Sequence, residues 1–307
     1  MADWGIVAAR FLQFGPALIL FGTPLYFLYG IDRGGAVQMS RSSHGLKHAV
    51  AAAGILSLTG AIWWVLAETA MIFSDPGQFT PDAVWTVLTG TGFGRAAFLR
   101  IILIAVAIAV PFVIRSSRRL WLVQAVIGAA VVVSFAWTGH GVKDEGAAGY
   151  VHLIGDIVHL LAASIWVGAL LALAAVLSES VRTRTGAQDV LRGLAAFSSV
   201  GVAVVGLLFL SGMINSWFLV GPSHLRQLVT SPYGLLLDAK LVLFAAMLAF
   251  AAANRYRFTP RLNAALAQAG SQEESLTVLR RSIVLETALA ALVLAIVSLM
   301  GTLEPPA

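Results

Sequence analysis

The sequence predicts an all-α polytopic membrane protein with about eight transmembrane helices in one bundle. Hydrophobic residues make up 59% of its 307 residues and charged residues only 11%, against roughly 45–50% and 25% in soluble domains. Such a chain cannot cover a water-facing surface. Long apolar runs recur from Phe11 to Leu303, so residues 1–307 are predicted to form a single transmembrane domain embedded in the lipid bilayer.

The individual spans follow from the uncharged runs between charged residues. A hydrocarbon core about 30 Å thick needs roughly 20 helical residues, because each backbone amide in lipid must be satisfied within its own segment. Six runs are long enough alone, whereas the third and seventh spans must include Arg100 and the pair Asp238 and Lys240. The predicted spans, in order, are 9–29, 48–73, 96–114, 120–138, 152–177, 194–219, 234–254 and 282–303.

The basic residues predict how the bundle is oriented. Fourteen of the twenty Lys and Arg residues fall in the loops after spans 1, 3, 5 and 7, and such loops are cytoplasmic. Both termini are therefore predicted to be periplasmic. The formal net charge of +5 comes from these clusters at span ends, so nucleic-acid binding is not implied. The clusters are Arg33, Arg41 and Lys47; Arg115, Arg118 and Arg119; Arg182, Arg184 and Arg192; and Arg255, Arg257, Arg261, Arg280 and Arg281.

A stripe of ionisable residues opens the fifth span. His152, Asp156 and His159 are offset by four and seven residues, which places them on one helical face. The chain has no cysteine, and imidazole suits copper, zinc or haem iron, with a carboxylate to orient the ring. The two histidines are roughly 10 Å apart along the axis, so they can share one ion only if their side chains converge or other helices contribute ligands. His140 and His224 are candidates, while the alternative is that the stripe makes hydrogen bonds between helices.

Other polar residues in the predicted spans mark a site or an internal pair, because each charge there costs about 2.5–3.5 kcal/mol. Glu68 with Arg100, or Asp238 with Lys240, are predicted as neutralising pairs or as part of a substrate path. Glu286 is expected to be matched by Arg280, Arg281 or another loop arginine. The accessory ligand candidates are His224, Met213, Met71 and Glu68. The remaining intramembrane polar candidates are Arg100, Asn215, Asp238, Lys240 and Glu286.

The segment His152-Leu-Ile-Gly-Asp-Ile-Val-His159-Leu-Leu-Ala-Ala-Ser-Ile-Trp166-Val-Gly168 resembles the signature span of the CopD copper-resistance membrane proteins. Two later stretches resemble the same family. The resemblance covers about residues 135–307, and the first four spans resemble the family in size and layout alone. The later stretches are Ser211-Gly-Met-Ile-Asn215 with Ser231-Pro-Tyr233-Gly234, Lys240 and Asn254-Arg255, and Arg280-Arg281-Ser282 with Glu286 and Gly301-Thr-Leu-Glu-Pro305-Pro306.

The resemblance implies a bacterial inner-membrane protein of copper homeostasis, a transporter rather than an enzyme. Such proteins are taken to import copper from periplasm to cytoplasm, often beside a small periplasmic copper carrier. By position, His140, His152 and His159 would handle the copper at the periplasmic face, together with Asp156. Two alternatives stay open. Two facing histidines could instead bind haem in a membrane electron-transfer protein, or the chain could be a non-transporting copper-binding accessory subunit that docks its partner through residues 75–94.

Overall fold

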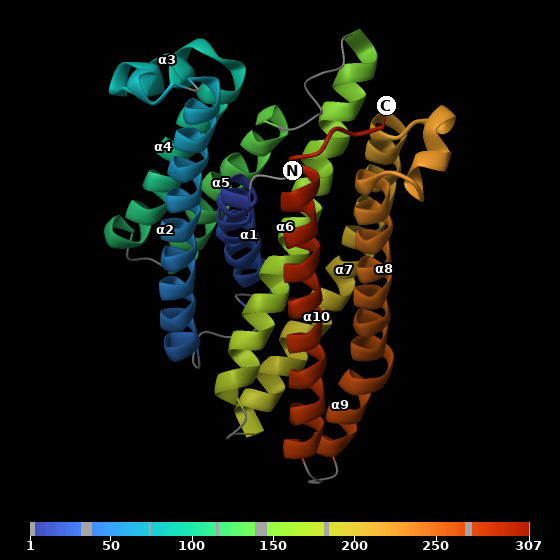
Figure 1. Cartoon of the computed structure of the whole chain (residues 1–307). Coiled ribbons are helices and arrows are strands. Elements are labelled where there is room, and N and C mark those ends of the chain that lie inside the picture. The colour runs from blue at the N-terminus through green and yellow to red at the C-terminus, as the bar shows by residue number, and fades with distance from the viewer. Residues whose placement is uncertain are drawn as a thin grey trace.

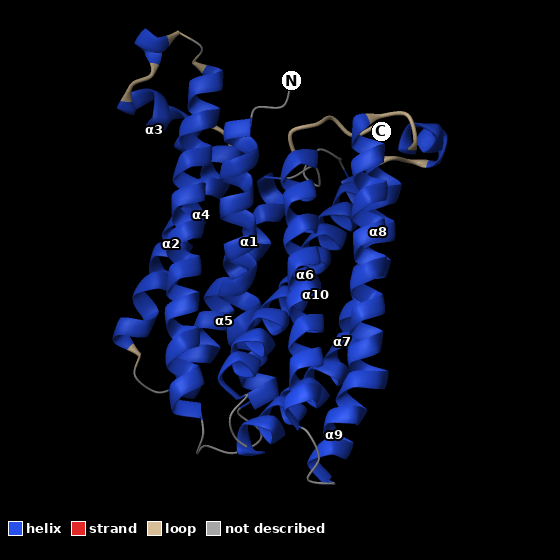
Figure 2. Ribbon diagram, turned by 60° about the horizontal axis from the view of Figure 1, so that its bottom comes forward, coloured by secondary structure: helices blue, strands red, loops and turns tan. Residues whose placement is uncertain are grey.

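The computed structural model describes residues 4–31, 39–73, 75–114, 117–138, 146–180, 184–267 and 272–306, which form a bundle of helices without a strand (Figures 1 and 2). The long helices are α1 (Trp4–Tyr26), α2 (Met39–Ile72), α4 (Gly92–Val113), α5 (Ser117–Ser134), α6 (Gly146–Ser180), α7 (Arg184–Leu219), α8 (Pro232–Ala253) and α10 (Gln272–Met300). Shorter elements are α3 (Pro81–Gly90), α9 (Thr259–Ala267), the 3₁₀ segments η2 (Pro76–Gln78), η3 (Phe135–Thr138) and η5 (Pro222–Leu228), and the π-helical segments η1 (Phe27–Ile31) and η6 (Asn254–Phe258).

The structure confirms the all-α prediction and the number of spans. In the described part of the chain, eight helices are long and apolar enough to cross a membrane. The helices extend past several predicted boundaries, because a helix continues into the polar interface where hydrophobicity no longer marks it. The largest differences at a helix start are in the sixth and last spans, predicted from residues 194 and 282, where the helices begin at Arg184 and Gln272.

Two helices occupy the centre of the bundle. α1 packs against α2, α5, α6 and α10, and α6 packs against α7 and α10. Where α1 and α6 cross, Gly22 and Gly168 face each other so closely that a Cβ atom on either would strike the backbone of the other helix. Thr23 Oγ1 also donates to the Gly168 carbonyl over 3.2 Å. This small-residue contact brings two backbones together, as is usual between membrane helices.

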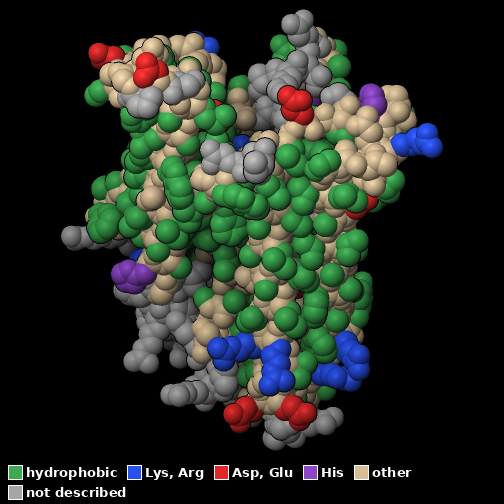
Figure 3. Space-filling view, viewed as in Figure 1, with side chains coloured by type: hydrophobic (Ala, Val, Ile, Leu, Met, Phe, Trp, Pro, Cys, Tyr) green, Lys and Arg blue, Asp and Glu red, His purple; other side chains and the backbone are tan. Residues whose placement is uncertain are grey.

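The two ends of the bundle differ in shape and charge. α1 begins and α10 ends at the same end, which also carries α3 and η5 (Figures 1 and 2); we call it the terminal end. The opposite end carries α9, and we call it the α9 end. Figure 3 shows Lys and Arg side chains gathered there. The exposed arginines of that region are Arg255, Arg257, Arg261, Arg280 and Arg281.

The polar stretch after span 2 contains a short surface helix. Thr80 caps α3 by accepting from the Ala83 N–H over 3.2 Å, and Pro81 takes the first helical position, where its missing N–H is not needed. Thr91 caps α4 in the same way through the Gly94 N–H. These caps hold the segment over the terminal end, with the Trp85 side chain 58% exposed.

Candidate functional site

The predicted stripe on α6 forms the interface with α7. The His152 ring is buried and stacks on Phe218, with 4.7 Å between centroids and 5° between planes. Asp156 Oδ1 accepts from Asn215 Nδ2 over 2.9 Å. His159 Nδ1 lies 3.0 Å from Ser211 Oγ. The α7 partners Phe218, Asn215 and Ser211 follow the same three- and four-residue spacing as the stripe, so two antiparallel helices meet through matched polar faces.

The hydrogen bonds of Ser211 determine the tautomer of His159. The serine hydroxyl donates to the Leu207 carbonyl, and a hydroxyl has only one proton to donate. Its oxygen is then free to accept from His159 Nδ1–H, and this arrangement favours the Nδ1–H tautomer. The proton-free nitrogen of the ring is then Nε2, which is the form in which a neutral imidazole binds a metal ion.

His159 lines a cavity of about 720 Å³ between α6, α7, α8 and α10, with η5 at its edge. We call it the His159 cavity. Two thioethers, Met213 and Met247, line the same space, as does Lys240. Met213 was predicted as an accessory ligand, whereas Met247 carries no sequence signal that separates it from a packing residue. Most of the remaining lining is apolar.

The predicted four-residue metal site is only partly described. Among the described residues, no three His, Asp or Glu side chains gather so that they could hold a metal ion. His152 and Asp156 are not among the residues that line the His159 cavity. His140 lies outside the described residues. A single ion shared by His152, Asp156, His159 and His140 therefore stays a prediction.

Lys240 is also influenced by a charge on another helix. The charge of Asp156 on α6 acts on Lys240 of α8. The predicted Asp238–Lys240 pair stays a prediction, and residues two apart on a helix do not face each other directly. The interaction between α6 and α8 links the polar stripe to the wall of the His159 cavity.

The first half of the bundle also departs from the predicted pairing. Arg100 is fully buried, and its guanidinium donates to Ser134 Oγ and the Ser134 carbonyl, both over 2.8 Å, and to Thr138 Oγ1 over 3.0 Å. Glu68 instead accepts from Trp64 Nε1 over 3.0 Å, and its charge acts on Arg10. In place of the expected Glu68–Arg100 pair, Arg100 therefore binds neutral acceptors, and Glu68 interacts with Arg10.

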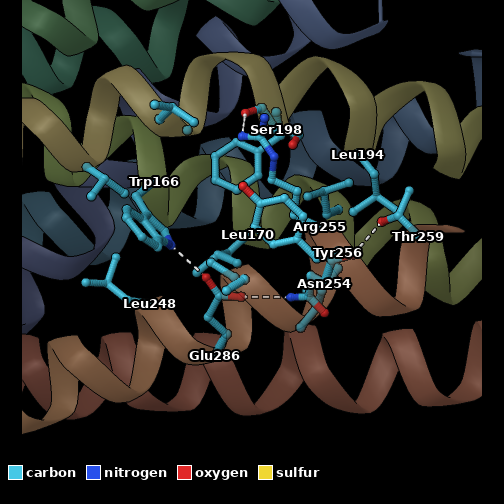
Figure 4. Close-up of a pocket in the computed structure, with 18 of the residues that line it drawn as sticks. Trp166, Leu170, Leu194, Ser198, Leu248, Asn254, Arg255, Tyr256, Thr259 and Glu286 are labelled. Atoms are coloured by element: carbon cyan, nitrogen blue, oxygen red, sulfur yellow. Dashed lines mark hydrogen bonds between the residues drawn. The ribbon is translucent and has the colours of Figure 1, made fainter.

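Glu286 lies in a second, smaller cavity (Figure 4). It is buried, and its Oε1 accepts from Trp166 Nε1 over 2.8 Å while its Oε2 accepts from Asn254 Nδ2 over 3.0 Å. The cavity has a volume of about 320 Å³, and we call it the Glu286 cavity. A loop arginine was the expected partner. Arg255 lines this cavity, but its Nη1 donates to the Ser198 carbonyl over 2.9 Å.

The two remaining accessory candidates lie away from both cavities. The His224 ring is half-buried in η5, with Nδ1 3.3 Å from Ser223 Oγ. The Met71 side chain is 58% exposed at the end of α2. Neither residue lines the His159 cavity or the Glu286 cavity.

Known proteins resemble this chain along its whole length. Residues 1–150 match the family model of the copper resistance protein D-like, N-terminal domain, and residues 191–300 match that of copper resistance protein D. Copper resistance protein D of Pseudomonas syringae pv. tomato is 33% identical over 311 residues, covering 99% of this chain and 98% of that protein. No solved structure matches this chain.

Two further relatives are more distant. The inner membrane protein YebZ of Escherichia coli (strain K12) is 28% identical over 308 residues, covering 97% of this chain and 98% of that protein. The copper transport protein CutJ of Bacillus subtilis (strain 168) is 25% identical over 261 residues, covering 81% of this chain and 46% of that protein.

Proposed function

Because this chain belongs to the copper resistance protein D family, we propose that it imports copper across the bacterial inner membrane by way of the His159 cavity. The observation that carries the proposal is the set of ligand atoms in that cavity. The imidazole of His159 and the thioethers of Met213 and Met247 line one space that is open at the bundle surface, where the Met213 side chain is 56% exposed, and these nitrogen and sulfur ligands suit monovalent copper better than hard cations.

We propose that copper approaches the cavity along the stripe on α6, of which His159 is the residue that lines the cavity. His152 is near the start of α6, towards the terminal end, and His159 lies two turns further along the helix. We assign His152, with His140, to the entry of copper at the periplasmic face and His159 to its binding inside the bundle. Asp156 supplies negative charge between them. Copper is the cargo in this proposal, so the chain acts as a transporter rather than as an enzyme.

Copper content is expected to depend on His159. We expect His159→Ala to lose stoichiometric copper after loading and desalting, because the cavity then keeps only thioethers. Ser211→Ala is expected to weaken binding about tenfold, since the ring loses the partner that orients it. The matched control is His48→Ala, which removes an exposed histidine from the first half of α2. Metal analysis of the four proteins, wild type included, makes the comparison.

The same samples distinguish the alternative functions. A Soret band in the wild-type protein would assign the histidines to haem, which needs an axial imidazole. Copper binding without uptake into proteoliposomes would make the chain an accessory subunit. Equal copper content in wild type and His159→Ala would reject the His159 cavity as the binding site.

The orientation is a separate proposal, supported by the arginines at the α9 end. With that end in the cytoplasm, a reporter that is active only there should work when inserted near Gly270 and should fail when fused after Ala307. The opposite pattern would reverse the direction of the proposed route.

In the proposed orientation α3 faces the periplasm, where its exposed Trp85 would help dock a small copper carrier.

A further inference from the structure

The His159 cavity and the Glu286 cavity share a wall. Trp166 and Leu248 line both of them. The Trp166 ring lies edge-on between Phe244, which lines the His159 cavity, and Phe197, which lines the Glu286 cavity, with centroids 6.0 Å and 6.4 Å away. The indole, together with Leu248, therefore stands between the two cavities.

A single hydrogen bond ties the indole to the buried carboxyl group of Glu286. Trp166 Nε1–H donates to Oε1, and an indole nitrogen can donate but not accept. Hydrogen bonds to an ionised acceptor are roughly twice as strong as those between neutral groups. The charge on Glu286 therefore determines how firmly Trp166 is held in the wall.

Asn254 can serve both protonation states of Glu286. Its Nδ2 donates to Oε2 of Glu286, which satisfies an ionised carboxylate. Its Oδ1 is buried and has no hydrogen-bond partner in the described part of the chain. If the amide turns over, Oδ1 becomes the acceptor for a protonated Oε2–H.

The backbone places Asn254 at this position. Asn254 begins the π-helical segment η6, in which the Thr259 N–H and hydroxyl both bond to the Asn254 carbonyl. Such single-turn π segments insert an extra residue and occur often at functional sites. Here the turn directs Asn254 inward while the neighbouring Arg255 and Tyr256 side chains are exposed at the rim of the cavity.

The ligands of the second cavity do not suit monovalent copper. Glu286 and Asn254 present carboxylate and amide oxygens, which favour protons and hard cations, whereas the His159 cavity presents nitrogen and sulfur. Buried carboxyl groups in membrane helices commonly carry protons. The second cavity therefore has the chemistry of a proton site rather than of a second copper site.

We propose that Glu286 binds a proton from the α9 end and that this proton opens the Trp166 barrier to copper. The proton passes from water in the Glu286 cavity to Oε2, and the Asn254 amide turns so that its Oδ1 accepts a hydrogen bond from Oε2–H. Trp166 then donates to a neutral carboxyl oxygen. This hydrogen bond is weaker, and the indole can leave the wall between the cavities. Release of the proton to the same water restores the stronger bond and closes the barrier. The inference rests on the proposed transport function, with Trp166 as a positioning residue.

Other titratable groups lie near α10, and they are separate from the hydrogen bond between Glu286 and Trp166. Arg255 and Tyr256 of η6 line the Glu286 cavity. The elements packed against α10 also carry Tyr26 on α1, Asp156 and His159 on α6, Lys240 on α8 and Arg261 on α9. In the described part of the chain, the hydrogen bonds of the Glu286 carboxyl group go to Trp166 and Asn254.

Copper uptake into proteoliposomes at several internal pH values tests the proposal. With the α9 end inside, wild-type uptake should rise as the internal pH falls, by up to about tenfold per unit for one proton. Glu286→Gln keeps the shape of the protonated group, so its uptake should stay high and lose this dependence. Trp166→Phe keeps a ring but removes the bond, and should also lose it. Glu273→Gln, an exposed glutamate on the same helix, should behave as wild type.

A second measurement separates this inference from the transport proposal. The infrared band of a protonated carboxyl group should titrate in wild-type protein in detergent, be absent in Glu286→Gln, and change its midpoint in Trp166→Phe. A titrating band without copper uptake would reject transport but keep the proton site. Unchanged pH dependence of uptake in Glu286→Gln, the absence of the band in wild type, or a requirement for sodium instead of protons would overturn the proposal.

Discussion

Gly168→Leu is expected to give almost no folded protein, because the new side chain would occupy the backbone of α1. The atoms that a Cβ at Gly168 would meet are the Cα and carbonyl carbon of Gly22 and the nitrogen of Thr23. Backbone atoms in the middle of a helix cannot turn aside as a flexible side chain can. Overpacking in a core costs about 1–3 kcal/mol even when side chains can yield, and we expect a larger loss here.

The measurement is the yield and thermal midpoint of the detergent-solubilised protein by size-exclusion chromatography. Gly206→Leu is the matched control, because no atom lies within 4 Å of a Cβ at that position on α7. Gly22→Leu should fail as Gly168→Leu does, since the contact is mutual. A Gly168→Leu protein that elutes and melts as wild type would mean that α1 and α6 do not cross at these residues.

Arg100→Met is expected to destabilise the first half of the bundle by about 2–4 kcal/mol, because it leaves buried acceptors without donors. The guanidinium binds Ser134 and Thr138 where α5 changes into the 3₁₀ segment η3, and lies 3.8 Å from the Phe135 ring centroid. It also faces the carbonyl end of α5, where a helix favours positive charge.

The matched control is Arg95→Met, which removes an exposed arginine from the same helix. Arg100→Lys should be nearly as unstable as Arg100→Met, since one ammonium group does not reproduce the planar fork that reaches both partners. Thermal unfolding followed in detergent gives the comparison. Equal midpoints for Arg100→Met and Arg95→Met would contradict a capping role for Arg100.

The sequence predicted the architecture because membrane insertion depends on local properties. Each span has to be apolar and helical by itself, so eight spans could be found without knowing which helices touch. The α6 stripe was also predictable, since helical spacing alone puts His152, Asp156 and His159 on one face. Their partners were not, because which face of α7 meets that stripe is decided by packing along both helices.

The charge partners failed for a related reason. Glu68 and Arg100 were matched because both lie in spans, but an arginine in membrane can be satisfied by hydroxyl and carbonyl oxygens. The nearer charge for Glu68 is Arg10, on the crossing helix α1.

The role of Trp166 was equally hidden, because a tryptophan that separates two cavities has the same sequence signature as one that fills a core.

Under the proposed copper-import function, the largely apolar lining of the His159 cavity has a consequence for hard cations such as sodium. A sodium ion entering it would exchange its water shell for leucine, valine and phenylalanine side chains, which cannot replace those contacts. A copper ion bound by nitrogen and sulfur ligands would instead replace the bonds to water that it loses on entering the cavity. The lining would therefore oppose the passage of sodium, so that a copper importer of this kind could work without a leak of the cell's sodium gradient.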